Sequence, residues 1–529
     1  MGKFSPPDRC SSRLHTMNRI LPPKRAWPLH GVAATRRIEA DATDALPPHT
    51  LMRRAGEALA QLTLAIAPHA QRVWVAAGPG NNGGDGLEAA ALLQAAGKQV
   101  HVSWLGAAEG EQRAPADALD AHARAAAAGV LINGEWPCGL QPPDVAIDAL
   151  LGIGATRAPA GRMAEMVERL NTLACEVIAV DVPSGLDADR GQAWGAACVR
   201  ADHTLSLLTL KPGLFTAIGR DQCGAVWLDT LEVTDDDAPD AWLSGAAAAV
   251  SPRRHAQHKG SFGDVVVVGG AAGMAGAALL AARAAQAAGA GRVIVDWLQD
   301  ATQALGVDAL HPELMMPSGW SLSEPAVLKA ATVVCGCGGG SAVRERLPRL
   351  LSLAGRLVLD ADALNALASD PQLLAQLRQR RAQRLATVIT PHPLEAARML
   401  NCGVTQIQAD RLAAARALTE LTGCVVVLKG SGSVTAAPGR TPHINGTGNA
   451  SLASGGTGDV LAGWLGGRWA QGGRCVGSLI DEFELAFATA SQAVADHGAA
   501  AEPERPGTLA ASELIEGLRR RLAMSLPAT

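Results

Sequence analysis

The amino-acid sequence predicts an α/β protein built from two three-layer α/β/α domains. The chain has 529 residues, well above the size at which a single hydrophobic core stops growing, so two or more domains are expected. Short β-rich runs alternate with alanine-rich amphipathic stretches of helical length, and this alternation is interrupted once near the middle of the chain. Hydrophobic residues make up 48% and charged residues 18% of the sequence, which is typical of a globular protein.

The first series of β-rich runs begins at Val73, Asp144, Glu176 and His203. Helical stretches between such runs are the signature of a parallel sheet covered on both faces. The alternation is lost between about 232 and 252, where an acidic run (Asp235, Asp236, Asp237) and two prolines (Pro239, Pro252) flank an alanine patch. We interpret this stretch as a linker.

The second series of β-rich runs begins at Asp264, Arg292, Thr332, Arg356, Thr387 and Cys424. It predicts a second α/β/α domain. The domains are expected to span residues 17–235 and 248–525. Their glycine loops fall at different places in the order of strands, so two distinct sites are implied.

Charge and cysteine content narrow the class of partner and compartment. A net charge of −4, from 46 basic and 50 acidic residues, gives no reason to expect nucleic acid or an anionic membrane. Ten scattered cysteines without a C-x-x-C pair indicate reduced thiols in a cytoplasmic protein. Residues 1–16 lack the apolar stretch of a signal peptide, and no apolar run is long enough to span a bilayer. Either Met1 or Met17 could be the start.

A glycine-rich loop, GPGNNGGDG at 78–86, lies between the first strand and a helix. Backbone N–H groups and the helix dipole at such a point can hold an anion such as a phosphate. The alternative is a tight turn that only needs positive φ angles. Asn81, Asn82 and Asp85 favour a ligand site, because three polar side chains exceed what a turn requires.

Three further polar residues follow later strands of the same series: Asp148, Asp181 and Ser184. Ligands of open α/β sheets gather at the carboxyl ends of the strands. Oxygen-only groups such as Asn82, Asp148 and Ser184 suit a hard monovalent or alkaline-earth cation rather than zinc. Each carboxylate also has a plain alternative as a helix N-cap or turn former.

Four motifs together, MRRAG at 52, GPGNNGGDG at 78, DALLGIG at 148 and DVPSGLD at 181, resemble the NAD(P)H-hydrate epimerase domain, a Rossmann-like fold. The resemblance implies a potassium ion held by Asn82, Asp148 and Ser184. It implies that the substrate contacts Asp181 and two loops, formed by Asn81, Asn82, Gly83, Gly84 and Asp85 and by Gly152, Ile153, Gly154, Ala155, Thr156, Arg157 and Ala158.

Epimerising a hydrated dihydropyridine at C6 needs an acid–base carboxylate, for which Asp148 and Asp181 are the candidates. A lysine that some relatives carry after the second strand has no obvious counterpart in HVSWLGAAEG at 101. A binding-only relative that serves as a scaffold in RNA processing is the non-enzymatic alternative for this half.

In the second half, the stretch NGTGNASLASGGTGDVLAGWLGG at 445–467 predicts an anion hole at the start of a helix. The amides of residues 456–458 would face a phosphate, and Asp459 in the first turn could take a proton from a hydroxyl. The alternative is that Asp459 only caps the helix.

Further segments add to this second site. Residues 429–433, KGSGS, lie between two strand-like runs and could embrace a nucleotide phosphate. His392 lies between two prolines at a strand end, a rigid position, although a lone histidine is more often structural. Another strand–glycine–helix edge places Ala277 near a helix start, and LDADALN at 359 adds two acids.

These motifs resemble the ADP- or ATP-dependent NAD(P)H-hydrate dehydratases of the ribokinase-like superfamily, over about 248–525. The resemblance implies substrate contacts from Ala277, Gly338, His392 and Asp459, with Asp459 catalytic, and nucleotide contacts from Lys429, Gly430, Ser431, Gly432, Ser433 and Gly458. Since bacterial fusions of this kind resemble ADP users, we expect ADP, accompanied by Mg²⁺. The loop that usually contains proline and leucine among its glycines reads GCGGG at 336–340.

Together the resemblances imply a bifunctional enzyme that epimerises NADHX and NADPHX, the hydrated cofactors, and dehydrates their S form with ADP, releasing AMP and phosphate. We expect it to be a homo-oligomer. The enzymatic alternative is a ribokinase-like sugar or hydroxymethylpyrimidine kinase with an amino-terminal nucleotide-binding scaffold. The non-enzymatic alternative is a cofactor-sensing protein, which would bind without turnover.

Overall fold

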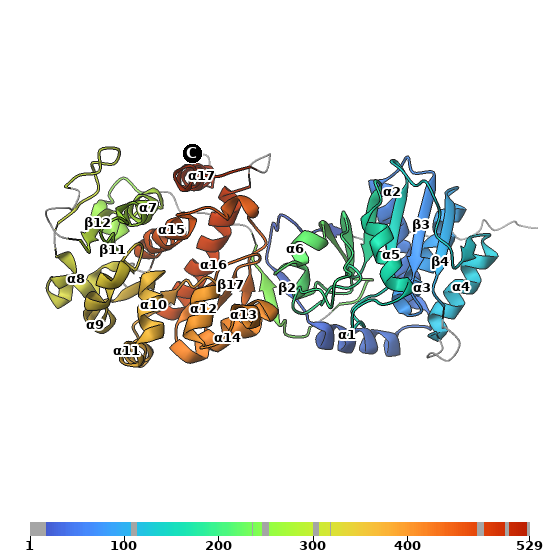
Figure 1. Ribbon diagram of the computed structural model, residues 1–529, viewed down its shortest axis with the longest axis horizontal. Helices are drawn as coiled ribbons and strands as arrows, with labels where there is room; N and C mark the ends of the chain where they lie inside the picture. Colours follow the sequence, from blue (N-terminus) through green and yellow to red (C-terminus); the bar gives the residue numbers. More distant parts are fainter. Residues whose placement is uncertain are drawn as a thin grey trace, which may run out of the picture.

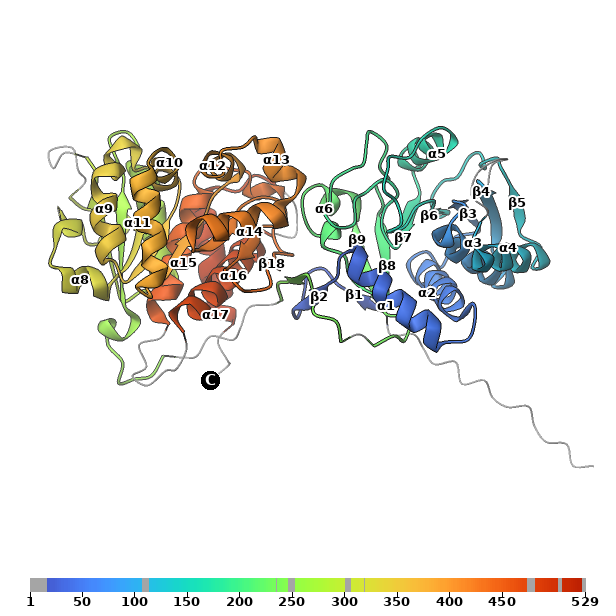
Figure 2. The ribbon, with the colours of Figure 1, turned by 90° about the horizontal axis from the view of Figure 1, so that it is seen from below.

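The computed structural model describes residues 17–106, 114–234, 236–245, 253–299, 306–317, 319–472, 481–502 and 507–525. The chain forms two lobes that lie side by side (Figure 1), and in each lobe helices flank a mostly parallel sheet (Figure 2). The expected fold class is confirmed: the chain is an α/β protein with two three-layer α/β/α domains. The β-rich runs named above all form strands.

The amino-terminal lobe is built on an eight-stranded sheet of order β1-β9-β8-β7-β6-β3-β4-β5. All neighbours are parallel except β1 and β9. The carboxyl ends of its parallel strands therefore meet at one edge. The strands are β1 (Asn18–Arg19), β3 (Arg72–Ala77), β4 (Gln99–Trp104), β5 (Leu131–Asn133), β6 (Val145–Ala149), β7 (Glu176–Val180), β8 (His203–Leu207) and β9 (Ala225–Asp229).

Two apolar layers fix the helices of this lobe on the sheet. One layer packs α2 and α3 against the face that carries Val75 and Ile147. The other packs α5 against the face that carries Trp74 and Ala146. The helices are α1 (Val32–Ala45), α2 (Thr50–Ile66), α3 (Asn81–Ala95), α4 (Ala116–Ala127), α5 (Arg162–Asn171), η1 (Pro212–Leu214) and α6 (Gly219–Gln222).

The carboxy-terminal lobe is built on a ten-stranded sheet of order β12-β11-β13-β14-β15-β16-β17-β18-β10-β2. The strands from β12 to β16 are parallel, and β17 is antiparallel to both its neighbours. The strands of this lobe are β11 (Asp264–Gly269), β12 (Arg292–Trp297), β13 (Thr332–Cys335), β14 (Arg356–Leu359), β15 (Thr387–Ile389), β16 (Val425–Leu428), β17 (Val434–Ala436) and β18 (His443–Ile444).

Helices again cover both faces of this second sheet. They are η2 (Lys259–Phe262), α7 (Ala275–Ala287), η3 (Trp320–Leu322), α8 (Pro325–Ala330), η4 (Gly340–Ala342), α9 (Val343–Leu353), α10 (Asp362–Ser369), α11 (Pro371–Ala382), α12 (Pro393–Met399), α13 (Val404–Ala409), α14 (Arg411–Thr422), η5 (Ala450–Leu452), α15 (Thr457–Gln471), α16 (Glu482–Ala500) and α17 (Ala511–Met524).

The last two strands of the second sheet come from outside the carboxy-terminal half of the chain. β10 (Ala241–Leu243) pairs with β18, and β2 (Trp27–Leu29) pairs with β10. The stretch 232–252, expected to be a linker, therefore contains a strand. A run of only three apolar residues is too short to be recognised as a strand among prolines and acids. The domain limits 17–235 and 248–525 remain a prediction. The pairing of β2 with β10 and of β10 with β18 joins the two lobes.

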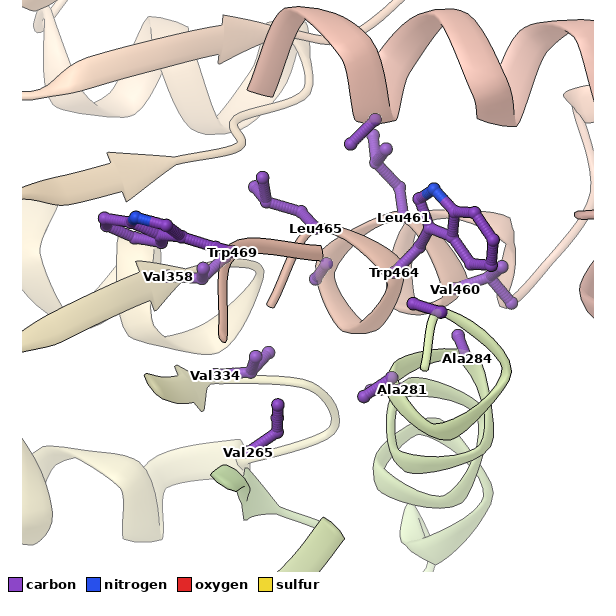
Figure 3. Close-up of a cluster of buried hydrophobic side chains, with 14 of the residues drawn as sticks. Val265, Ala281, Ala284, Val334, Val358, Val460, Leu461, Trp464, Leu465 and Trp469 are labelled. Atoms are coloured by element: carbon purple, nitrogen blue, oxygen red, sulfur yellow. The ribbon is translucent and has the colours of Figure 1, made fainter. Parts of the chain in front are cut away.

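Close contact between α7 and α15 positions the start of α15. A Cβ atom on Gly463 would lie 1.9 Å from the Ala281 carbonyl oxygen, and one on Gly467 would lie 2.4 Å from that of Ala285. Figure 3 shows Ala281 and Ala284 of α7 facing the apolar side chains of α15. The GGTGD motif is thus held against the core.

Two expectations about the whole chain can be compared with the described residues. The cysteines among them are free thiols, most of them buried. In the part of the chain that the structure describes, no helix combines the length and the apolarity needed to cross a bilayer.

Candidate functional site

The amino-terminal glycine loop brings backbone segments very close together. None of the five glycines from Gly78 to Gly86, all of them described, has a positive φ. Instead, a Cβ on Gly78 would lie 1.9 Å from the Leu150 carbonyl oxygen, and one on Gly83 would lie 1.9 Å from the Gly78 oxygen. The requirement is close approach rather than a left-handed turn, so the positive-φ alternative fails here.

Asp148 and Ser184, two of the expected cation ligands, are directly bonded. The Ser184 hydroxyl donates to Asp148 Oδ1 at 2.6 Å, and the Ser184 amide donates to Oδ2 at 2.8 Å. The Asp148 side chain belongs to a fully buried residue, and this burial raises its pKa to about 6 despite these hydrogen bonds. Desolvation disfavours the charged form, which a bound cation would restore.

Asn82 and Asp181 converge on Gly152. A Cβ on Gly152 would lie 3.0 Å from Asn82 Oδ1 and 3.3 Å from Asp181 Oδ2. The Ile153 amide donates to Asp181 Oδ2 at 3.3 Å. Asn82 Nδ2 is buried and has no hydrogen-bond partner among the described residues. An orphaned buried donor at this place is consistent with a ligand that is expected to satisfy it.

The rest of the predicted substrate loop lies toward the surface, with Gly154, Thr156 and Arg157 exposed. A Cβ on Gly154 would lie 3.8 Å from a guanidinium nitrogen of Arg36. The structure therefore brings the start of this loop to Asp181 and leaves its middle open.

Lys211 is a site residue that sequence reasoning missed. Its Nζ contacts Asp181 Oδ1 and also donates to the Leu207 carbonyl oxygen at 2.8 Å, and the side chain is 0% exposed. A buried ion pair at a predicted catalytic carboxylate is a strong indication of function. The sequence position of Lys211 could have indicated it. Lys211 lies shortly after the end of β8, which neighbours β7 on the same edge of the sheet.

Two further carboxyl groups surround this pair. Burial raises the pKa of Asp85 well above its usual range, and the negative charge of Asp181 raises it further. Glu39 of α1, also missed from the sequence, has a pKa raised by burial and by Asp181 and lowered by Lys211. The amino-terminal site is therefore rich in carboxyl groups, of which Asp181 and Glu39 interact with Lys211.

In the carboxy-terminal lobe, Asp459 lies in the first turn of α15 and does not cap it. The N-cap residue is Gly456, with a φ of 88° and no side-chain cap hydrogen bond. Ligand atoms of Asp459, Asp360 and Cys337 lie within 4.8 Å of one another. Burial, then the charge of Asp360, raise the pKa of Asp459 to about 6. The capping alternative is therefore not supported, and the carboxyl group is tuned toward neutral pH.

Lys429, the first residue of the predicted nucleotide segment 429–433, lies beside these acids. Its Nζ is 2.7 Å from Asp360 Oδ1, which also accepts a hydrogen bond from the Thr390 hydroxyl at 2.8 Å. A Cβ on Gly458 would lie 3.4 Å from Lys429 Nζ. The structure thus brings together Lys429, Gly458 and Asp459, and their roles toward nucleotide and substrate remain a prediction.

Gly338 and Ala277 also meet. Gly338 has a φ of +57°, and a Cβ on it would lie 2.6 Å from the Met274 carbonyl oxygen and 3.0 Å from the Ala277 Cβ. Gly338 follows Cys337 directly, so the GCGGG loop connects the start of α7 to the Asp459 cluster.

His392 has a clear structural role. It is the N-cap of α12, and its Nδ1 accepts hydrogen bonds from the amides of Leu394 and Glu395 at 3.1 and 3.4 Å. Partial burial and the positive charge of Lys429 lower its pKa. Burial raises the pKa of the neighbouring Glu395 to about 7. A substrate contact from His392 remains a prediction beside this capping role.

The predicted nucleotide segment 429–433 packs against other parts of the protein at two glycines. Gly430 has a φ of +135° and lies against the Arg411 guanidinium, and Gly432 has a φ of +60° and lies against the Phe215 carbonyl oxygen. Phe215 belongs to the amino-terminal lobe, so this segment lies where the two lobes meet.

Each lobe thus carries a lysine–carboxylate pair at the carboxyl edge of its parallel strands, with the lysine side chain 0% exposed in the first pair and 18% exposed in the second. With a glycine-lined helix start beside each pair, the fold and the sites define a two-site α/β enzyme that acts on small phosphate-bearing molecules.

Comparison with known proteins identifies the class more narrowly. The family described as "YjeF-related protein N-terminus" matches residues 48–213, and the family described as "NAD(P)H-hydrate dehydratase" matches residues 265–518. The bifunctional NAD(P)H-hydrate repair enzyme Nnr of Escherichia coli (strain K12) is 36% identical over 96% of this chain and 96% of its own length. The chain therefore belongs to the bifunctional NAD(P)H-hydrate repair enzymes, as the two sequence resemblances implied.

Other similar proteins include the Nnr enzyme of Coxiella burnetii, which is 34% identical over 80% of this chain and 86% of its own length. A solved structure of the ADP/ATP-dependent NAD(P)H-hydrate dehydratase from Bacillus subtilis, co-crystallised with ATP and Mg²⁺, is 26% identical with a TM-score of 0.41, covering 52% of this chain and 95% of that chain.

Proposed function

We propose that the carboxy-terminal site dehydrates the S form of NADHX and NADPHX with ADP, producing AMP and phosphate. The observation that carries this proposal is the position of Asp459. It lies in the first turn of α15 without capping the helix, and its pKa is raised to about 6. A carboxylate with a pKa just below neutral pH is ionised and still basic enough to accept a proton.

The reaction then has two steps. Asp459 takes the proton of the C6 hydroxyl, and the hydroxyl oxygen attacks the β-phosphorus of ADP, so that AMP leaves. The ring nitrogen lone pair then expels phosphate from C6, and loss of a ring proton restores the dihydropyridine. The amides at the start of α15 and the Lys429 ammonium group stabilise the charge that develops on the phosphoryl oxygens.

The residues of this site fit a magnesium ion bound together with the nucleotide. The carboxylate of Asp360 is a hard oxygen donor of the kind that Mg²⁺ prefers, and its ligand atom lies within 4.8 Å of that of Asp459. When bound, the ion neutralises phosphate charge. Lys429 to Ser433 and Gly458 are proposed to contact the nucleotide, and Ala277, Gly338 and His392 to contact the hydrate.

In the amino-terminal site, we propose that Asp181 and Lys211 act as the acid–base pair for epimerisation. They accept and donate the proton that is transferred while the configuration at C6 of the hydrate is inverted. Asp181 lies beside Gly152 and Asn82 at the substrate loops, and Lys211 contacts it directly. Asp148 is a less suitable base, because it is fully buried, whereas the side chain of Asp181 is 12% exposed and has a lysine beside it to share the proton. We therefore assign proton transfer to Asp181 rather than to Asp148.

Asp148, Ser184 and Asn82 are proposed to hold a potassium ion. Their donor set is made only of oxygen atoms, and the raised pKa of the buried Asp148 carboxyl group indicates a position where a positive charge would be stabilising. The ion supplies a fixed positive charge that orients substrate oxygens. Replacing potassium by sodium or choline is expected to slow epimerisation and to leave dehydration of the S form unchanged.

We place the enzyme in the cytoplasm as a homo-oligomer with NADHX, NADPHX and ADP as its small-molecule partners. The free thiols support the cytoplasmic placement, and the modest net charge supports small-molecule partners. Size-exclusion chromatography coupled to light scattering measures the oligomeric state directly.

The deciding experiment follows the absorbance of the reduced nicotinamide ring after hydrated NADH is mixed with the protein. We expect the signal to return only when ADP is present, with release of one phosphate and one AMP for each NADH formed. A ribokinase-like kinase would instead accumulate a stable phosphorylated product, and a sensor protein would bind without releasing phosphate.

A further inference from the structure

One short stretch of the amino-terminal lobe, residues 215–220, touches both backbone segments that lead into the dehydratase site. It follows η1 and ends in α6, at the junction between the two lobes (Figure 1). We call it the bridging segment. It starts four residues after Lys211, the lysine of the amino-terminal site.

The bridging segment binds the nucleotide segment through its backbone. The Ala217 amide donates to the Ser431 carbonyl oxygen at 3.2 Å, and the Thr216 hydroxyl lies 3.4 Å from the same oxygen. A Cβ on Gly432 would lie only 2.0 Å from the Phe215 carbonyl oxygen. The two backbones are therefore packed directly against each other at residues 431 and 432.

Arg220 binds the second segment, the NGTGN loop at 445–449 that precedes the GGTGD helix. Its Nη1 donates to the Thr447 carbonyl oxygen at 3.1 Å, and its Nη2 donates to that of Gly448 at 3.0 Å. The Gly448 amide donates in turn to Glu502 Oε1 at 2.7 Å. The Gly448 backbone is thus fixed by a side chain from each lobe.

The two segments are also joined to each other. The Asn445 amide donates to the Ser433 carbonyl oxygen at 2.9 Å, and Asn445 Nδ2 donates to the Thr447 oxygen at 3.1 Å. One continuous network therefore runs from the nucleotide segment through Asn445 and Thr447 to Arg220.

The bridging segment is firmly rooted in its own lobe. The Ile218 amide donates to the Gly191 carbonyl oxygen at 3.1 Å, and Phe215 is fully buried in an apolar cluster that also contains Leu243 and Ile444. Burial lowers the pKa of the Arg220 guanidinium, yet this group keeps two charge-assisted hydrogen bonds, which are worth more than neutral ones.

We propose that Arg220 is a positioning residue for the nucleotide site of the dehydratase, so that the amino-terminal lobe completes the site of the other lobe. Arg220 does not touch the reacting atoms; it holds residues 447 and 448, and through them the loop and helix start that face the nucleotide. The inference rests on the proposed ADP-dependent dehydration and assigns part of its affinity for ADP to a residue outside the dehydratase lobe.

The test compares Arg220→Ala with Arg416→Ala in the full-length protein. Arg416 also crosses the junction, donating to the Asp240 carbonyl oxygen at 2.8 Å, but among the described residues its guanidinium group makes no hydrogen bond to either of the two segments. We expect Arg220→Ala to raise the KM for ADP about tenfold, the size of one lost hydrogen bond to a charged group. Its kcat and its epimerisation rate should stay within about twofold, and Arg416→Ala should match the wild type.

Two milder variants separate positioning from loss of folding. Arg220→Lys keeps the positive charge but loses the planar fork of donors that reaches both carbonyl oxygens, and it should raise the KM for ADP less than Arg220→Ala does. Thr216→Val removes the longer contacts to Ser431 and Gly432 and should have the smallest effect. Thermal denaturation and calorimetric titration with ADP alone, without the hydrate, complete the comparison.

An Arg220→Ala protein that binds ADP as the wild type does would overturn the inference. So would an equal loss of dehydration and epimerisation, or an equal effect of Arg416→Ala, because either result would mean a general loss of structure. Failure of the wild-type protein to dehydrate the hydrate with ADP would count against the proposed function instead.

Discussion

The two lobes use the same pair of residue types in different ways. In the amino-terminal lobe, Lys211 is bonded to Asp181, and Asp181 itself lies beside the substrate loops. In the carboxy-terminal lobe, Lys429 is bonded to Asp360, whereas the proposed general base is a different residue, Asp459. The lysine ammonium group thus contacts the proposed catalytic carboxylate directly in the amino-terminal lobe. In the carboxy-terminal lobe it contacts a neighbouring carboxylate instead.

This difference matches the two reactions. Epimerisation must move a proton in both directions, and a contacting lysine and carboxylate can serve as acid and base in turn. Dehydration needs one proton accepted from a hydroxyl at the start, which favours an acid whose basicity is increased by burial and by a neighbouring negative charge. Asp459 meets this condition, with its pKa raised to about 6.

The largest expected effect is from Asp459→Asn. Removing the base should lower the rate of ADP-dependent dehydration by about 10³-fold, within the range of general-base catalysis, and should leave epimerisation unchanged. The rates are measured from the absorbance of the reduced ring and from the epimer ratio by chromatography. Asp496→Asn is the matched control. Asp496 lies in α16, and its Oδ2 accepts a hydrogen bond at 3.3 Å from Trp464 of α15, the helix that carries Asp459. Normal dehydration by Asp459→Asn would refute the assignment of the base.

The second effect concerns the other pair. Lys211→Met should slow epimerisation about 10²-fold, while dehydration of the pure S form continues. Because the substitution leaves Asp181 buried without its cation, it should also lower the thermal stability of the protein. Lys98→Met is the control, since Lys98 donates to the carbonyl oxygens of Pro68 and Ala70, at 3.0 and 2.7 Å, elsewhere in this lobe. If both variants epimerise equally fast, Lys211 has only a structural role.

The same pairs show how far the sequence could predict the sites. Asp181 and Asp360 were recognisable because each directly follows a β-rich run that proved to be a strand, and Asp459 because it lies in a glycine-rich helix start. Lys211 was not, because it lies 30 residues beyond Asp181 in a loop where a lysine is normally solvated. Only the order of the strands, with β7 beside β8, brings it to that carboxylate.

The fold was predictable to a similar depth. Valine-rich parallel strands give strong local signals, so both domains could be recognised. β2, β10 and β18 have only two or three residues each, and they form strands because the neighbouring segments supply hydrogen-bond partners. Tertiary pairing of this kind leaves little trace in composition, which is why the lobe junction and Arg220 were not foreseen.

A third prediction uses pH to separate the two lobes within one protein. Because Asp459 must be ionised to accept a proton and its pKa is raised to about 6, kcat/KM for dehydration should fall as the pH drops below that value. At pH 5 about one tenth of the carboxyl groups would be ionised, so the rate constant should be about tenfold lower than its plateau. Epimerisation, followed at the same pH values, serves as the internal comparison. A flat dehydration profile between pH 5 and 8 would remove Asp459 from the base position.

The smallest expected effect comes from Cys337, the residue that stands in the GCGGG loop. Burial raises the pKa of its thiol well above the usual range, so the sulfur is protonated and can donate to the Asp459 carboxylate. That hydrogen bond lowers the pKa of Asp459 and partly opposes the effect of burial. Cys337→Ala should therefore move the acid limb of the dehydration profile to higher pH, with little change in the plateau rate.

The direction of this shift discriminates between two roles of the sulfur atom. If Cys337 only filled space, alanine would leave a small cavity that lowers thermal stability and would not move the acid limb. Cys337→Ser, which keeps a donor at nearly the same place, should restore the wild-type profile. A profile that moves to lower pH in the alanine variant would mean that the thiol does not stabilise the ionised carboxylate. The difference between the lobes would then depend on Asp360 and burial alone.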